Sequence, residues 1–169
     1  MTCKIRIARK VLLLTIGRSM QDKVKSSRNL SSLLHLACPC GQVSKPQNKS
    51  VGQALSFLNC CSHYIERGLK PLDAYSLMRS RYTAFALEIA PYLLTTWHPK
   101  HRPQEIQFER GIKWVGLEIL DCCDTGPTSS DVEFIARYKV GGKAQKIHER
   151  SHFVFEESRW YYTDGELFD

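Results

Sequence analysis

The chain has 169 residues and a mass of 19.4 kDa, which suits one domain of ordinary size with a small addition. Hydrophobic residues make up 43% of the sequence and charged residues 24%, so a disordered, collagen-like or coiled-coil chain is excluded. The longest aliphatic run, residues 11–14, is far shorter than the ~18 apolar residues that a membrane-spanning helix requires.

The formal net charge of +7 comes from one end of the chain. Residues 1–37 carry eight Lys and Arg side chains and one acidic residue, Asp22, whereas residues 38–169 carry equal numbers of positive and negative charges. Binding to a phosphate backbone depends on a basic surface. We therefore do not expect the neutral body to bind nucleic acid.

Residues 1–37 form a basic head. It places basic residues before a short apolar run, as a signal peptide does, but Gly17 and Arg18 follow where a cleavage site should stand. We expect no export signal and interpret the head as a disordered leader, or as an extension upstream of a true start at Met20. An arm that binds a membrane surface or an anion is the alternative.

The seven cysteines are an odd number, which favours a reducing compartment, the cytoplasm, over a disulfide framework. Cys38, Cys40, Cys60 and Cys61 form two close pairs, and four thiolates fill a tetrahedral Zn²⁺ site of the structural type. The spacing within each pair is unusual for zinc ligands, so four buried free cysteines remain the alternative. His63 could also replace Cys61 as a ligand.

A helix is predicted over residues 73–89, because its apolar side chains are spaced by three or four residues. These side chains are Met78, Tyr82, Phe85 and Ile89. Arg79 lies off this stripe, and we expect its charge to face solvent. Arg81 lies nearer the edge of the stripe and is expected to reach inward. A second helix is predicted over residues 91–96, with Trp97 at its exit.

Downstream of the helices the apolar period changes to two, which indicates strands. We predict strands over residues 112–121, 132–140, 147–155 and 159–163, with a hairpin turn at Gly141-Gly142. The expected fold is α+β, with a mostly antiparallel sheet of four or more strands and helices on one face. Cys122 and Cys123 are expected to be core or incidental residues.

Glu149 falls on the apolar face of the third predicted strand, where a carboxylate is costly unless it is paired or protonated. We predict a buried ion pair between Glu149 and Arg81, with Tyr82 or Trp97 nearby. Two interpretations of this pair stay open: it only fixes geometry, or Arg81 binds an anion and Glu149 acts as a base in a pocket.

A series of short motifs resembles those of the bacterial YchJ family. They are Cys38-Pro39-Cys40-Gly41, Cys60-Cys61 followed by Tyr64, LMRSRYTAF at 77–85, YLL and TWHP within 92–99, HERS at 148–151 and WYYTDG at 160–165. The resemblance spans residues 38–165. It implies an N-terminal SEC-C zinc motif, similar to the zinc tail of the preprotein translocase motor. It also implies a curved antiparallel sheet wrapped by helices, resembling nuclear transport factor 2, and no established reaction.

The chain departs from the family pattern in three places. Between Cys40 and Cys60 stand 19 residues, more than twice the family's number, which a polar insertion at 43–53 explains. A longer loop costs little closure entropy, about 0.6 kcal/mol per doubling, so the four cysteines can still converge. A second cysteine motif common in the family is absent here, and the family's Arg in the third strand is His152. The expected units are a leader (1–37), a zinc knuckle (38–68) and a domain resembling nuclear transport factor 2 (69–169).

The leading functional hypothesis is a zinc-stabilised protein of the cytoplasm. Its knuckle would be structural or would dock a protein partner, and its pocket would bind a small ligand. The alternative is an enzyme of the isomerase or hydratase type using Glu149 and Arg81, by analogy of fold alone. Nucleic-acid binding by the basic head is a third possibility.

Overall fold

The computed structural model describes residues 30–45 and 52–168, so most of the expected leader lies outside the described residues. The elements are η1 (Leu30–Leu33), η2 (Phe57–Asn59), α2 (Ser62–Ile65), α3 (Ala74–Leu87), α4 (Ala90–Thr95), β1 (Lys113–Gly126), β2 (Ser129–Val140), β3 (Lys143–Glu156) and β4 (Arg159–Phe168). Within these described ranges, no helix combines the length and the apolar character that crossing a membrane demands.

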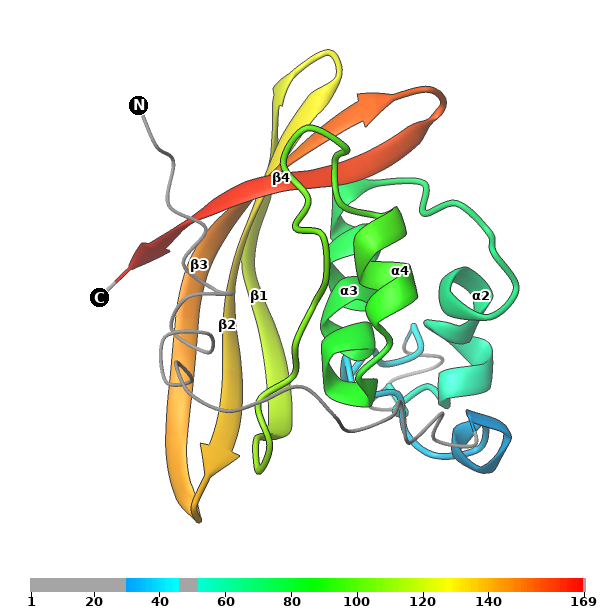
Figure 1. Cartoon of the computed structure of the whole chain (residues 1–169). Coiled ribbons are helices and arrows are strands. Elements are labelled where there is room, and N and C mark those ends of the chain that lie inside the picture. The colour runs from blue at the N-terminus through cyan, green and yellow to red at the C-terminus, as the bar shows by residue number, and fades with distance from the viewer. Residues whose placement is uncertain (1–29, 46–51, 169) are drawn as a thin grey trace.

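The four strands form one antiparallel sheet in the order β1-β2-β3-β4, which confirms the predicted α+β fold. Register shifts interrupt the β1–β2 and β3–β4 pairings, and such bulges bend a sheet. Figure 1 shows the resulting twist, with β4 at the edge of the sheet beside β3. Gly141 and Gly142 have positive φ angles of 55° and 78°, as a two-residue hairpin turn requires.

One face of the sheet is buried under α3, against which α4 packs (Figure 1). The side chains of β2 alternate as predicted, with Val132, Phe134 and Ala136 buried. Their counterparts on β3 are Glu149 and Ser151, which are buried among apolar residues. The helices therefore cover the face that carries the predicted carboxylate.

Helix α3 begins and ends close to the predicted positions. The side chain of Asp73 caps it by accepting a hydrogen bond of 2.6 Å from the backbone N–H of Ser76. At the other end, Glu88 adopts a left-handed conformation with φ 60°, which stops the helix. These two residues define the two ends of α3.

The prediction that Arg79 faces solvent is wrong. Helix α3 lies between the sheet and the segment that carries the cysteines (Figure 1), so both of its sides are covered. The Arg79 guanidinium is half-buried and donates hydrogen bonds to the Cys40 carbonyl oxygen (2.6 Å) and to the Tyr75 hydroxyl (3.1 Å). A single apolar stripe does not reveal a second covered face that is built from sulfur and polar contacts.

The cysteines share one hydrophobic core with the rest of the fold. Cys38, Cys40, Phe57 and Cys61 belong to the same cluster of buried residues as Leu77, Tyr82, Val132, Phe134 and Phe153. Leu33 and Leu34 of the expected leader also pack against this core. Residues on both sides of residue 38 and of residue 69 therefore contribute to this cluster, while Ala84, Tyr92 and Leu93 form a second, smaller one.

Candidate functional site

The sulfur atoms of Cys38, Cys40, Cys60 and Cys61 lie within 4.8 Å of one another. The Cys40 Sγ is 3.5 Å from that of Cys38 and 3.6 Å from those of Cys60 and Cys61, and the last two are 3.8 Å apart. All four are free thiols. A tetrahedral ion with metal–sulfur distances of about 2.3 Å separates its ligands by about 3.8 Å, so the cluster fits such an ion.

Backbone pairing brings the two cysteine pairs together despite the long loop between them. We call residues 37–44 and 53–65 the cysteine segment. The Cys38 N–H donates to the Leu55 carbonyl oxygen and the Leu55 N–H to that of Gln42, both at 2.8 Å. Val43 and Ala54 form a further antiparallel bridge. The chain on the two sides of the insertion is therefore paired through backbone hydrogen bonds. The added residues do not separate the two cysteine pairs.

Helix α3 supports the cluster from its covered side. The buried hydroxyl of Thr83 donates a hydrogen bond of 3.3 Å to the Cys61 sulfur and lies 3.7 Å from that of Cys38. Arg79, one turn earlier, brings a positive charge beside Cys40. Four thiolates around a divalent cation carry a net charge of −2, which this arginine offsets in part. The sequence pattern of α3 indicated neither role.

The thiols share their protons unequally. Hydrogen bonds from Cys40, Cys60 and Cys61 hold the pKa of Cys38 far below its usual range, because they stabilise its thiolate. The hydrogen bond to Cys38 instead raises the pKa of Cys60 and of Cys61 well above the usual range. Four negative charges this close need a cation to form together. The donor set is thus one that a thiophilic divalent ion completes.

The predicted direct ion pair between Arg81 and Glu149 is not formed, although both side chains are buried. The Arg81 guanidinium donates to the Leu93 carbonyl oxygen (2.9 Å) and to the Thr96 hydroxyl (2.8 Å). Its central carbon lies 4.5 Å from the centre of the Tyr162 ring. The residue that stands between the two charges is therefore Tyr162, which was not among the predicted site residues.

The two predicted aromatic neighbours of this pair lie in different places. Trp97 is beside Arg81, with 5.1 Å between the guanidinium carbon and the ring centre, and its ring also packs edge-on against Tyr162. Tyr82 instead packs edge-on against Trp114 of β1, at 5.6 Å between ring centres. The structure thus joins Trp97, and not Tyr82, to the buried arginine.

Glu149 is held by neutral groups. Its Oε1 accepts hydrogen bonds from the Ser151 hydroxyl (2.6 Å) and the Tyr162 hydroxyl (3.5 Å), and its Oε2 has no hydrogen-bond partner. Burial raises the pKa of Glu149 to about 7, and the two hydrogen bonds and the charge of Arg81 oppose this effect only in part. The carboxyl group is therefore protonated in a large fraction of molecules at neutral pH.

Substituting Gly165 with alanine is expected to lower the free energy of unfolding by about 2 kcal/mol, because the added methyl group would overpack the core. The added Cβ would collide with the Glu149 carboxyl group, which is fully buried. Gly116→Ala on β1 is the matched control, since its Cβ would meet no atom within 4 Å. Urea denaturation of both variants measures the difference, and equal stabilities would contradict this account of Gly165.

The histidines of the sheet each bind a carboxylate of their own. His148 Nε2 lies 2.8 Å from Glu133 Oε1, and His152 Nδ1 lies 2.7 Å from Asp131 Oδ1. His63 is not part of the sulfur cluster. Within the residues that the structure describes, the four cysteines form the one group suited to a metal ion.

Cys122 and Cys123 are exposed on β1, so they are not core residues.

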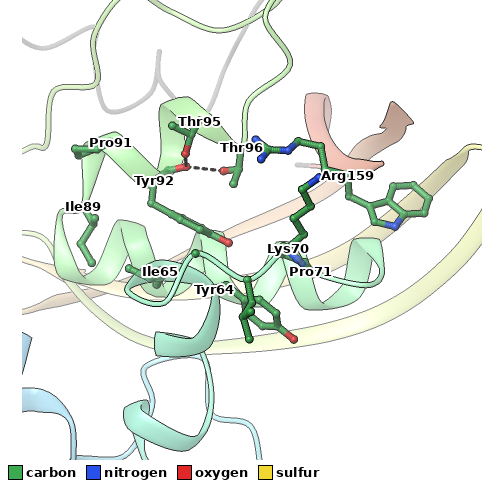
Figure 2. Close-up of a pocket in the computed structure, with 13 residues that line it drawn as sticks. Tyr64, Ile65, Lys70, Pro71, Ile89, Pro91, Tyr92, Thr95, Thr96 and Arg159 are labelled. Atoms are coloured by element: carbon green, nitrogen blue, oxygen red, sulfur yellow. Dashed lines mark hydrogen bonds between the residues drawn. The ribbon is translucent and has the colours of Figure 1, made fainter. Parts of the chain in front are cut away.

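A cavity of about 390 Å³ opens where the chain that follows the cysteines meets α4 and β4 (Figure 2). Tyr64 and Ile65, which follow Cys61 by three and four residues, form one wall, and Ile89 and Tyr92 form another. A smaller cavity of about 220 Å³ lies beside Cys60 and Cys61, and a third of about 540 Å³ lies between Pro39 and β1. None of these three cavities is lined by Glu149, which is fully buried.

Comparison with known proteins supports the same architecture. Residues 73–165 match the family model described as YchJ, middle NTF2-like domain. The UPF0225 protein of Polaromonas sp. is 47% identical over 132 residues, which cover 76% of this chain and 91% of that protein. The UPF0225 protein of Polaromonas naphthalenivorans is 44% identical over 132 residues, covering 78% of this chain and 97% of that protein.

Two solved structures share the fold. The solution structure of a SEC-C motif containing protein from Rhodopseudomonas palustris has a TM-score of 0.63 and 29% identity, covering 79% of this chain and all of the other. The crystal structure of a SEC-C motif containing protein from Psychrobacter arcticus has a TM-score of 0.65 at 24% identity and covers 82% of this chain and 86% of the other. With its NTF2-like region, its cysteine cluster and these relatives, the chain belongs to the YchJ family.

Proposed function

We propose that this protein is a zinc-stabilised binding module, in which Zn²⁺ at Cys38, Cys40, Cys60 and Cys61 holds one wall of a ligand cavity. The observation that carries the proposal is the spacing of the four sulfur atoms, 3.5 to 3.8 Å for the closest pairs, which suits tetrahedral coordination. Thiolate donors in this geometry favour zinc over magnesium or calcium, which bind oxygen ligands. Free thiols also suit a reducing compartment such as the cytoplasm.

The zinc would be structural and not catalytic. Four thiolates occupy every position of a tetrahedral ion and leave none for water or substrate. Cys38, Cys40 and Cys61 are each at most 4% exposed. What the ion would supply is a crosslink within the cysteine segment, and the exposed surface of that segment could in addition dock a protein partner.

The link between metal and cavity is direct along the chain. Helix α2 starts one residue after Cys61, and the Ile65 N–H donates to the Cys61 carbonyl oxygen at 3.0 Å. Tyr64 and Ile65 of this helix line the cavity. An ion that fixes Cys61 therefore fixes the helix and with it one wall of the cavity.

A binding role fits better than the isomerase or hydratase alternative. Glu149 would be the base in such an enzyme, but its carboxyl group is fully buried between Ser151 and Tyr162, away from the three cavities. A general base has to reach its substrate within hydrogen-bond distance. The buried Glu149, Tyr162 and Arg81 instead support the inner face of the domain.

The test is the zinc content of the purified full chain. We expect close to one zinc per chain in the wild type and a loss of most of it in the Cys38→Ser and Cys60→Ser variants. Cys122→Ser is the matched control, because Cys122 is an exposed cysteine on β1 and should leave the zinc in place. Retention of zinc by either ligand variant, or its absence from the wild type, would overturn the proposed site.

A further inference from the structure

The cavity of about 390 Å³ carries charge of one sign only. Of its 13 lining residues, Lys70 and Arg159 are the two with a formal charge, and both are positive. Lys70 belongs to the chain between α2 and α3, whereas Arg159 is the first residue of β4. Figure 2 shows both side chains extending toward the same end of the cavity. The fold thus brings two cations from distant parts of the sequence to one place.

Neither of these cations is neutralised by another side chain of the part that the structure describes. Among the described residues, no carboxylate forms an ion pair with Lys70 or Arg159. Arg159 has a single aromatic contact, at 5.8 Å from the centre of the Tyr161 ring, and this contact leaves its charge in place. Two like charges at one site repel each other, so an anion placed between them would be attracted by both.

A third positive charge lies behind the cavity wall. Arg81 donates to the hydroxyl of Thr96, and Thr96 lines the cavity. The acidic residue Glu149 lies in the same core but does not form a direct ion pair with Arg81, and burial raises its pKa to about 7, so it offsets the charge of Arg81 only in part. Arg81, behind the wall, therefore adds to the positive electrostatic potential that Lys70 and Arg159 create at this end of the cavity.

The end of α4 does not cancel this potential. A helix C-terminus has a partial negative charge on its free carbonyl groups. Here the Tyr92 carbonyl oxygen accepts hydrogen bonds from the hydroxyls of Thr95 (3.0 Å) and Thr96 (2.8 Å), and the Leu93 carbonyl oxygen accepts one from Arg81. These carbonyl groups are occupied and do not face the ligand space as free acceptors.

The remaining walls are mainly apolar. Ile65, Ile89 and Tyr92 line the space away from the two cations, and Pro71 and Trp160 add apolar surface next to them. A volume of about 390 Å³ is within the range of small-molecule sites, about 300 to 1,000 Å³. We propose that this cavity binds a small organic anion, with its apolar body against these walls and its anionic end between Lys70 and Arg159. This assignment rests on the proposed binding function of the cavity and not on the identity of the metal.

The test uses octanoate as a charged probe and octanamide as its neutral counterpart. Both are titrated into the isotope-labelled full chain, and amide resonances of cavity residues such as Gly68, Leu69 and Thr96 are followed. We expect saturable shifts for octanoate, with an affinity roughly five- to tenfold above that of octanamide. Equal affinities, or no saturable shift with octanoate, would overturn the proposal.

Variants locate the anionic end. Lys70→Gln and Arg159→Gln are each expected to weaken octanoate binding several-fold and to leave octanamide binding unchanged. Lys143→Gln, which removes an exposed charge at the start of β3, is the matched control and should change neither. Octanoate binding that is unaffected by Lys70→Gln and Arg159→Gln would also overturn the assignment. Zinc measured in the same samples distinguishes this failure from a failure of the metal site.

Discussion

Removal of zinc from the full chain is expected to lower the free energy of unfolding by about 4 kcal/mol, the contribution of a ligand about a thousandfold above its Kd. The loss should be concentrated in the cysteine segment, because the ion would crosslink its two halves. Amides such as those of Cys38, Leu55 and Ile65 donate to carbonyl groups of this segment. They should lose hydrogen-exchange protection on chelation, whereas amides of the β2–β3 pairing should keep most of theirs.

Cys61→Ser serves as the comparison for this experiment. It removes the sulfur that accepts a hydrogen bond from Thr83, so the variant should already be destabilised and should not respond further to a chelator. Cys122→Ser should behave as the wild type does, with a large response. Unfolding curves of the wild type that coincide before and after complete loss of metal would show that the cluster is not a structural zinc site.

The effect is expected to reach beyond the cysteine segment because the core is shared. Cys38, Cys40 and Cys61 belong to the same cluster of buried residues as Leu77 and Val132. Loosening one side of this cluster exposes apolar surface on α3 and costs about 25 cal/mol per Å². Chelation should therefore also weaken binding in the cavity, of which Tyr64 and Ile65 form a wall.

The parts of this structure that follow local periodicity could be predicted from the sequence. The spacing of Met78 and Tyr82 indicated α3, and the alternation of Val132 and Phe134 indicated β2 with its buried face. The unusual position of Glu149 was predicted by the same alternation. Each of these inferences depends only on neighbours within a few residues along the chain.

The contacts between elements could not be predicted in this way. The two charges were expected to meet directly, but the pairing of β4 with β3 places Tyr162 beside both Arg81 and Glu149. Tyr162 lies within the family motif at 160–165, so the sequence did mark this region. Its role could not be assigned, because it depends on which side of β4 faces inward. Lys70 and Arg159 lie far apart in the sequence, and only the packing of the α2–α3 connection against β4 brings them to one cavity. Periodicity predicts which face of each helix or strand is buried, whereas these sites depend on how the elements pack against one another.

The substitution Glu149→Gln is expected to remove a pH dependence from the stability of the protein. Burial raises the pKa of Glu149 from 4.5 to about 7, so the folded state favours the protonated carboxyl group more than the unfolded state does. The resulting stabilisation is fully present below about pH 4.5 and is lost as the pH rises through about 7. The free energy of unfolding of the glutamine variant minus that of the wild type should therefore rise by up to about 3 kcal/mol between pH 5 and pH 8.

Other groups that face Glu149 do not reverse this sign. The hydrogen bond from the Ser151 hydroxyl, the charge of Arg81 on α3 and the hydroxyl of Tyr162 on β4 all lower the pKa, but burial outweighs them. The proposed zinc–thiolate bonds would contribute in the opposite sense, since protons compete with the metal as the pH falls. This contribution is common to the wild type and the variant, so the difference between their unfolding free energies at each pH isolates Glu149.

The measurement is urea denaturation of both proteins from pH 5 to pH 8, at equal zinc content. A difference that grows in favour of Glu149→Gln as the pH rises supports a carboxyl group that is neutral because of its burial. A constant difference would mean that Glu149 does not titrate in this range. If the variant instead becomes less stable than the wild type toward pH 8, Glu149 is ionised and stabilised by Arg81. The two charges would then interact across Tyr162, as the ion pair expected from the sequence.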